Sequence, residues 1–64
     1  MRTDLVIKYL EELELPYDDY CVNYIVKNWE KEHEEEIKEN NLYEIDEEDV
    51  KSYWLYYVKE NLFN

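Results

Sequence analysis

Few side chains in this sequence could act in nucleophilic catalysis, since it has one cysteine, one histidine and one serine. Such catalysis needs a nucleophile within hydrogen-bond reach of a base, and a third group that orients the base. Cys21 lies at the edge of an apolar stripe, where a free cysteine usually behaves as a small buried hydrophobe. Little remains to orient or support a catalytic pair. The sequence therefore predicts a protein that is not an enzyme.

A metal site would depend on Glu30 and His33, whose spacing matches the Glu-x-x-His pair that helical di-iron proteins carry on each of two helices. One copy does not complete such a site, so a homodimer would have to supply the second. His33 also shares an apolar stripe with Trp29 and Ile37, which indicates a packing role. The absence of glycine excludes the P-loop, the dinucleotide fingerprint and the EF-hand calcium loop. We therefore expect no metal and no cofactor.

Charge is the most unusual property of the chain, because seven basic residues stand against eighteen acidic ones and the net charge is −11. Affinity for nucleic acid comes mostly from Lys and Arg that neutralise phosphates, so direct nucleic-acid binding is not expected. No apolar run approaches the roughly 20 residues that span a bilayer, and the helices are too acidic for an anionic membrane surface. A single cysteine and no expected signal peptide predict a reducing, cytoplasmic setting.

Acidic residues gather in three zones, at positions 11–19, 30–39 and 44–49. Charge runs are commonly solvated surfaces that aid solubility. A net charge of −11 nevertheless exceeds the magnitude of roughly 2–8 that suffices for a small domain, and its self-repulsion costs stability. Carboxylates three or four positions apart on a helix lie roughly 5–6 Å apart, which is comparable to the spacing of successive phosphates. We expect one such row at Glu32, Glu35 and Glu39 and another at Glu30 and Glu34.

Eight tyrosines and two tryptophans are a large aromatic content for 64 residues, and both types are enriched at binding hot spots. For a single tyrosine, the simpler interpretation is an amphipathic residue at the edge of the core. The residues expected in the core are Trp29, Trp54, Tyr53 and Tyr57. Tyr56 is expected to point away from the core, and the candidates for exposure are Tyr17, Tyr20, Tyr24 and Tyr43. The predicted partner-binding set is Glu30, Glu32, Glu34, Glu35, Glu39, Glu44, Asp46, Glu47, Glu48, Asp49, Tyr20, Tyr24, Tyr43 and Tyr56.

Apolar periodicity predicts three helices that would position these residues, over positions 4–14, 18–39 and 47–62. Thr3 is placed as the N-cap of the first helix, and Pro16 ends it. Asp18 or Asp19 caps the second helix, and Asn40-Asn41 ends it. The apolar stripes of these two helices are Val6, Tyr9, Leu10 and Leu13, and Val22, Ile25, Val26, Trp29, His33 and Ile37.

The third helix has the clearest start, with Asp46 as N-cap, Asp49 in an acidic capping box, and Ile45 and Val50 as a hydrophobic staple. Its apolar positions extend nearly all round, which is typical of a helix buried on several sides. They are Val50, Tyr53, Trp54, Leu55, Tyr57, Val58 and Leu62. We therefore predict an all-α fold in one domain of residues 1–64, either a small three-helix bundle or a helical hairpin with a third packed helix.

Small, acidic, aromatic-rich chains of this kind resemble in overall character the phage-encoded inhibitors of nucleases, restriction enzymes, CRISPR effectors and polymerases. The lack of glycine, alanine and glutamine also indicates an AT-rich genome, such as that of a low-GC bacterium or its phage. We expect an inhibitor whose acidic face occupies the basic nucleic-acid groove of a target protein and competes with DNA or RNA. The alternative is a helical adaptor or antitoxin that forms a homodimer, or binds a partner protein, through its C-terminal helix.

Overall fold

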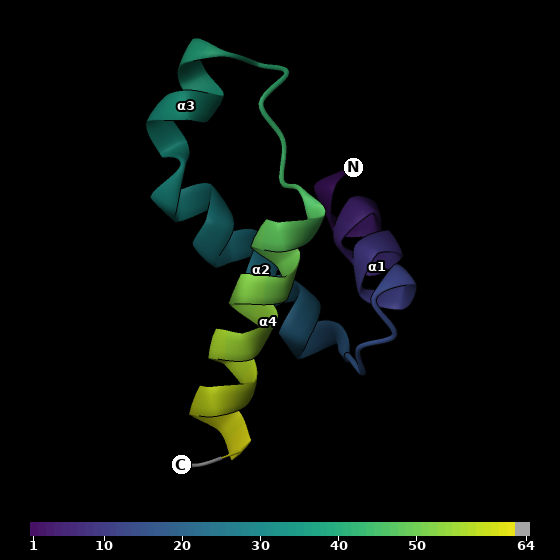
Figure 1. Cartoon of the computed structure of the whole chain (residues 1–64). Helices are drawn as coiled ribbons and strands as arrows, with labels where there is room; N and C mark the ends of the chain where they lie inside the picture. Colours follow the sequence, from purple (N-terminus) through teal and green to yellow (C-terminus); the bar gives the residue numbers. More distant parts are fainter. Residues whose placement is uncertain (63–64) are drawn as a thin grey trace.

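Helices make up most of the chain. The computed structural model describes residues 1–62, and among these residues there is no strand. The side chain of Leu62, predicted on the apolar face, lies outside the described part. The all-α fold is confirmed, with four helices in place of three. These are α1 (Arg2–Glu12), α2 (Asp19–Glu32), α3 (Glu34–Glu39) and α4 (Glu47–Leu62) (Figure 1).

Three of the helices form the body of the molecule. α2 packs against both α1 and α4, and α1 also packs against α4. Among the described residues, α3 contacts no helix other than α2, and together with the loop that follows it projects from one end of the body (Figure 1). The molecule measures 36 × 24 × 18 Å along its principal axes. The fold is therefore a small three-helix bundle with a projecting arm.

Most residues of the predicted apolar stripes lie in or against the core, but Leu55 is 52% exposed, so the prediction that the C-terminal helix is buried on several sides was wrong. Full burial of a Val, Leu or Ile side chain stabilises a fold by about 1.5–3 kcal/mol, so these residues supply most of the driving force. Tyr9, Val26, Ile37, Trp54 and Tyr57 are partly buried and pack against this core. The buried residues are Val6, Leu10, Cys21, Val22, Ile25, Trp29, Ile45, Val50 and Tyr53.

The ends of α1 differ from the prediction. The helix begins at Arg2 after Met1, without a side-chain cap, so Thr3 lies inside the first turn. It stops at Glu12, because Glu14 adopts a left-handed conformation with φ 58°. Glu14 N–H donates to Glu11 O (3.1 Å) and Leu15 N–H to Leu10 O (3.0 Å), which is the hydrogen-bond pattern of a Schellman motif. This position usually holds glycine, and the chain has none to signal it.

The predicted second helix is interrupted at His33. Its start is as expected, since the Asp18 carboxylate accepts from Cys21 N–H at 2.8 Å. α2 ends at Glu32, however, and His33 leaves the helical region with φ −116° and ψ 24° before α3 begins. His33 Nδ1 lies 2.9 Å from Trp29 O, which also accepts from His33 N–H. A side chain that shares a carbonyl of its own helix competes with the regular hydrogen-bond ladder. Positions 18–39 therefore form two helices.

The start of α4 is close to the prediction. The Asp46 carboxylate accepts from Asp49 N–H at 2.8 Å, as an N-cap should. Ile45 and Val50 are both buried in the core, where a hydrophobic staple would place them. The Asp49 carboxylate accepts instead from Trp29 Nε1 at 3.0 Å, so it joins α4 to α2.

Candidate functional site

Arg2 joins three segments of the molecule at one end of the bundle. Its guanidinium carbon lies 4.7 Å from the centroid of the Trp29 ring, and it donates hydrogen bonds to the carboxylates of Glu30 and Glu44. Burial would raise the pKa of Glu44, but hydrogen bonds from Arg2 and from Ile45 N–H lower it below its ordinary value. Sequence reasoning missed this contact, because Arg2 and Glu44 are 42 positions apart.

Six of the predicted partner-binding carboxylates are bound within the molecule, including Glu34, which pairs with Lys38, and Asp46, which accepts from Asp49 N–H. Glu30 and Glu44 pair with Arg2, and Asp49 accepts from Trp29 Nε1. Glu32 accepts a hydrogen bond from the hydroxyl of Tyr53. These carboxylates hold the fold together, so a partner would have to share them with an internal donor.

The two predicted rows of carboxylates are also divided by the break at His33. Glu32 lies at the end of α2, whereas Glu35 and Glu39 lie on α3, so the three do not form one continuous helical row. Glu30 and Glu34 are separated in the same way, and Glu34 pairs at 4.0 Å with Lys38. The prediction of two rows on a single helix was therefore wrong.

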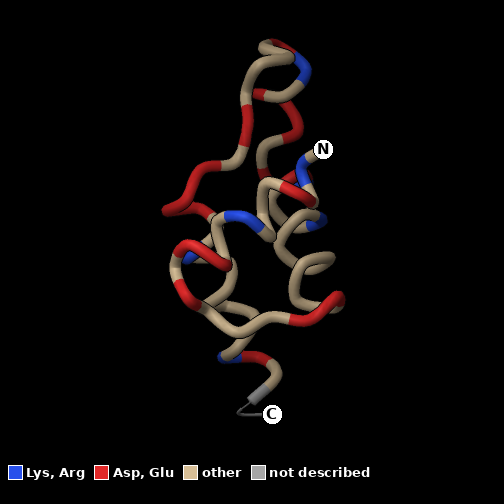
Figure 2. The backbone as a smooth tube through the Cα atoms, turned by 90° about the vertical axis from the view of Figure 1, so that its right-hand side faces the viewer, with Lys and Arg blue, Asp and Glu red and all other residues tan. Residues whose placement is uncertain are grey.

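Six exposed acidic residues lie on the projecting end of the molecule, which we call the acidic arm (residues 34–46). Figure 2 shows Asp and Glu positions along both sides of this end. Glu36 belongs to the arm and was absent from the predicted set, although it lies in the same acidic run. The exposed acidic side chains of the arm that no internal hydrogen bond or ion pair holds are Glu35, Glu36 and Glu39.

Two further predicted carboxylates lie away from the arm. Glu47 and Glu48 occupy the first turn of α4, where a negative charge is favourable at the positive end of the helix dipole. They line a hollow together with Leu13, at the end of α1. The structure therefore divides the predicted acidic surface into two parts.

The predicted exposed tyrosines fall into two groups. Tyr20 is 77% exposed and Tyr56 is 58% exposed, as expected. Tyr24 and Tyr43 are partly buried, because Tyr24 packs edge-on against Tyr57 (5.3 Å between centroids) and Tyr43 stacks on Trp29 (5.5 Å). The expectation of exposure at these two positions was wrong.

Five tyrosines lie along the pair of α2 and α4, and we call this set the tyrosine face (Tyr20, Tyr24, Tyr53, Tyr56 and Tyr57), of which Tyr20 and Tyr56 are exposed and Tyr53 is buried beneath Tyr56. Tyr53 and Tyr56 lie 6.2 Å apart, centroid to centroid. Burial raises the pKa of Tyr24, Tyr53 and Tyr57, and the carboxylates of Glu60, Glu32 and Asp18, respectively, raise it further. The hydroxyls of these three tyrosines therefore remain protonated, and the face presents aromatic rings between carboxylates.

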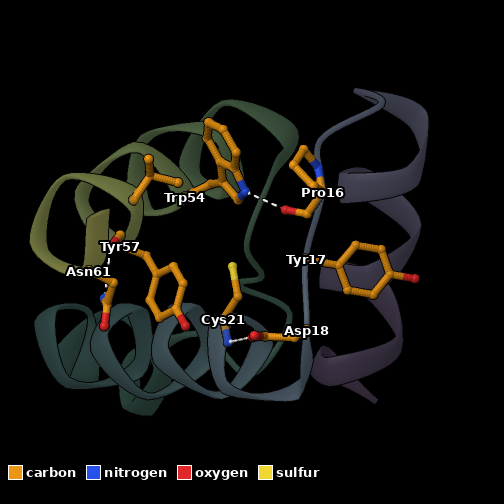
Figure 3. A pocket seen from close by; sticks show the side chains of 8 residues that line it. Pro16, Tyr17, Asp18, Cys21, Trp54, Tyr57 and Asn61 are labelled. Atoms are coloured by element: carbon orange, nitrogen blue, oxygen red, sulfur yellow. Dashed lines mark hydrogen bonds between the residues drawn. The ribbon is translucent and has the colours of Figure 1, made fainter. Parts of the chain in front are cut away.

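A hollow of about 430 Å³ lies between the loop after α1 and the second half of α4 (Figure 3). Trp54 Nε1 donates to Pro16 O at 2.8 Å across one edge, and the Cys21 sulfur points toward the space. Burial, with a smaller effect of Asp18, raises the pKa of the Cys21 thiol to about 11. A thiol with so high a pKa is a poor nucleophile at neutral pH, so the hollow offers no activated group.

Most of the basic residues lie in one region of the molecule, together with Glu30 and Glu34. Four of the seven lie around one hollow beside Ile37, and they are Arg2, Lys27, Lys31 and Lys38. Among the described residues, no group of three or more His, Cys, Asp and Glu side chains is arranged to hold a metal ion. No helix in the same part of the chain is long and apolar enough to cross a membrane.

In comparisons with known proteins, the chain matches no protein-family model, no curated protein and no solved structure. The geometry of its surfaces is therefore the basis for a functional proposal.

Proposed function

We propose that the protein is an acidic inhibitor that inserts its arm into the basic nucleic-acid groove of a target protein. The observation that supports this most directly is the exposed, internally unbound cluster of Glu35, Glu36 and Glu39 on a short helix that projects from the body. A projecting element can enter a groove that a flat face cannot. The target would be a nuclease, restriction enzyme, CRISPR effector or polymerase, as the resemblance to phage inhibitors suggests.

The spacing of the arm carboxylates suits competition with nucleic acid. Glu35 and Glu39 are four positions apart on α3, which places carboxylates roughly 5–6 Å apart, close to the separation of phosphates. Complementary charge mainly speeds association and selects the partner. Binding of this kind should therefore weaken steeply as salt concentration rises.

The first test is a competition assay on a captured target. The protein is immobilised and exposed to a lysate of a low-GC bacterium at low salt, and each retained nucleic-acid-binding protein is purified. Its affinity for labelled duplex DNA or single-stranded RNA is then measured in the presence of the wild-type chain. We expect the wild type to displace the nucleic acid.

A charge-matched pair of variants tests the mechanism. E35Q/E36Q/E39Q should compete about tenfold less well, because three contacts of roughly 0.5 kcal/mol each are lost. D4N/E12Q/E14Q, which removes three exposed carboxylates from α1 and its end, should compete like the wild type. If both variants competed with nucleic acid equally less well, only the total charge would matter. If neither variant competed less well than the wild type, the proposal would be contradicted.

A second candidate function is an adaptor or antitoxin that pairs through α4. The observation in its favour is the exposure of Leu55 and Tyr56, which leaves an apolar strip on that helix. This alternative predicts a homodimer that tolerates high salt. Light scattering at low and high salt distinguishes the two proposals, because the inhibitor is expected to remain a monomer in the absence of its target.

A further inference from the structure

The contact around Arg2 shows how this chain holds an arginine side chain. The guanidinium lies over the Trp29 ring at 4.7 Å while two carboxylates, Glu30 and Glu44, accept its hydrogen bonds. The planar, weakly hydrated guanidinium suits both contacts, because it stacks on aromatic faces and binds carboxylates through fixed donors. Arg2 is the one arginine in the sequence.

The tyrosine face also places aromatic rings and carboxylates together, here at the surface of the molecule. Tyr20 and Tyr56 are 77% and 58% exposed, so ring surface is accessible on both helices. Glu32, at one end of the face, accepts from the Tyr53 hydroxyl, and Glu60 lies close enough to Tyr24 to raise the pKa of its phenol. Aromatic rings therefore lie between carboxylates here as well, at a site that the chain's own arginine does not reach.

We propose that the tyrosine face binds arginine side chains of a basic protein segment, with guanidinium groups stacked on Tyr20 and Tyr56 and paired with Glu32 and Glu60, whose carboxylates accept more than one hydrogen bond each. This inference deepens the proposed function, since the basic target protein would supply the arginines. The acidic arm then provides electrostatic attraction, and the tyrosine face provides selectivity for arginine over lysine.

Other occupants fit this face less well. Lysine carries a compact, strongly hydrated charge that does not stack as a planar group. Nucleic-acid bases could stack on tyrosine, but a net charge of −11 repels the phosphates attached to them. A second copy of the chain carries the same repulsive charge, and its Arg2 is bound internally.

The probes for the test are labelled oligoarginine and oligolysine peptides of equal length, whose binding is measured by fluorescence anisotropy. We expect the wild type to bind oligoarginine about fivefold more tightly than oligolysine, the contribution of one or two exposed cation–π contacts. Y20L/Y56L should lose this preference and keep its affinity for oligolysine. Y17L, which changes a tyrosine outside the face, should keep the preference. Circular dichroism checks that each variant is folded.

The outcome separates this inference from the proposed function. E35Q/E36Q/E39Q should lower the affinity for both peptides by the same factor and leave the preference for arginine intact. If that preference is present while the wild type fails to displace nucleic acid from any target, the inhibitor proposal fails and the arginine site stands. Equal binding of both peptides by the wild type, or an unchanged preference in Y20L/Y56L, would overturn the arginine site. Binding of single-stranded RNA by the face, or a homodimer that Y20L/Y56L dissociates, would overturn it too.

Discussion

At the scale of single residues, Arg2 and its carboxylate partners decide how the arm joins the body. Arg2 lies at the start of α1, Glu30 in α2 and Glu44 in the loop before α4, so one guanidinium links segments that are distant in sequence. Local patterns cannot reveal such a contact. The sequence suggested that Glu30 and Glu44 were free to meet a partner, whereas the structure uses them to hold the arm in place.

The Glu44 contact makes part of the stability depend on pH. The pKa of Glu44 is lower in the folded chain than its ordinary value of 4.5, so its contribution is present above pH 4.5 and is lost as pH falls through the lowered pKa. We expect E44Q to be less stable than the wild type by about 1 kcal/mol at pH 7, since Glu44 is partly exposed to solvent. In acid, well below pH 4.5, the two should be equally stable.

Urea denaturation at both pH values measures this difference. E35Q serves as the control, because Glu35 is exposed and forms no internal ion pair or hydrogen bond, and it should match the wild type at pH 7. If E44Q were still less stable than the wild type in acid, the lost contact would not be ionic.

Cys21 provides a second prediction at this scale. Its thiol is buried, and its pKa is raised to about 11 from 9.0, so the thiolate fraction near pH 8 falls about hundredfold. We expect alkylation by iodoacetamide to be at least about hundredfold slower in the native protein than in urea. Mass spectrometry follows the labelling. Rapid native labelling would show that the hollow beside Cys21 opens readily.

At the scale of elements, the sequence predicted the features that depend on local chemistry. Asp18 and Asp46 cap α2 and α4, and the apolar stripes reach the core, because caps and periodicity are properties of neighbouring residues. The break at His33 was missed, since the imidazole contacts the rings of both Trp29 and Tyr43, which also stack on each other. Tyr43 comes from the loop after α3, so only the tertiary structure brings it there.

The left-handed conformation of Glu14 gives a prediction about α1. A side chain with a Cβ atom is strained at φ 58°, whereas glycine is not. We expect E14G to raise the free energy of unfolding by about 0.5–1 kcal/mol, even though glycine increases the entropy of the unfolded chain. Urea denaturation measures the change. E12G, inside the last turn of α1, is the control and should lower stability by about 1 kcal/mol. Equal destabilisation by both changes would contradict the strain at position 14.

The arm gives the second prediction at this scale. α3 has six residues and begins with three glutamates, and within residues 1–62 it contacts no helix but α2. Isolated helices shorter than about 12 residues are marginal in water, so α3 depends on the partly buried Ile37. We expect its amides to exchange with solvent faster than those in the middle of α2 by at least about tenfold. Hydrogen exchange followed by NMR measures the exchange rates in both helices. Equal protection would mean that the arm is as rigid as the bundle.

At the scale of the whole molecule, charge is distributed unevenly. The acidic arm and the tyrosine face are distinct sets of residues, whereas the hollow beside Ile37 combines Glu34 and Lys38 of the arm with Arg2, Lys27 and Lys31. Composition alone predicted an acidic, aromatic-rich binder, and that function stays a prediction. It could not predict which carboxylates form internal hydrogen bonds, because only the fold places a donor beside Glu32 and Asp49 and none beside Glu35 among the described residues.

The net charge of −11 predicts how salt affects stability. Self-repulsion among like charges destabilises the compact state, and added salt shortens the Debye length from about 30 Å at 0.01 M to a few Å near 1 M. The favourable ion pairs are few and partly exposed, so screening removes less attraction than repulsion. We expect Tm to rise by about 4–8 °C between roughly 10 mM and 0.5 M NaCl, equivalent to about 1 kcal/mol for a domain of this size.

Thermal unfolding followed by circular dichroism measures this rise, and the charge variants show whether repulsion causes it. E35Q/E36Q/E39Q removes three of the eleven excess negative charges, so its Tm should start higher at low salt and rise less. E44Q also removes a negative charge, but it breaks the pair with Arg2, so its Tm should start lower. If Tm fell with salt in the wild type, the local ion pairs would outweigh the overall repulsion. The high charge would then cost this fold little stability, and it would no longer suggest selection for a basic partner.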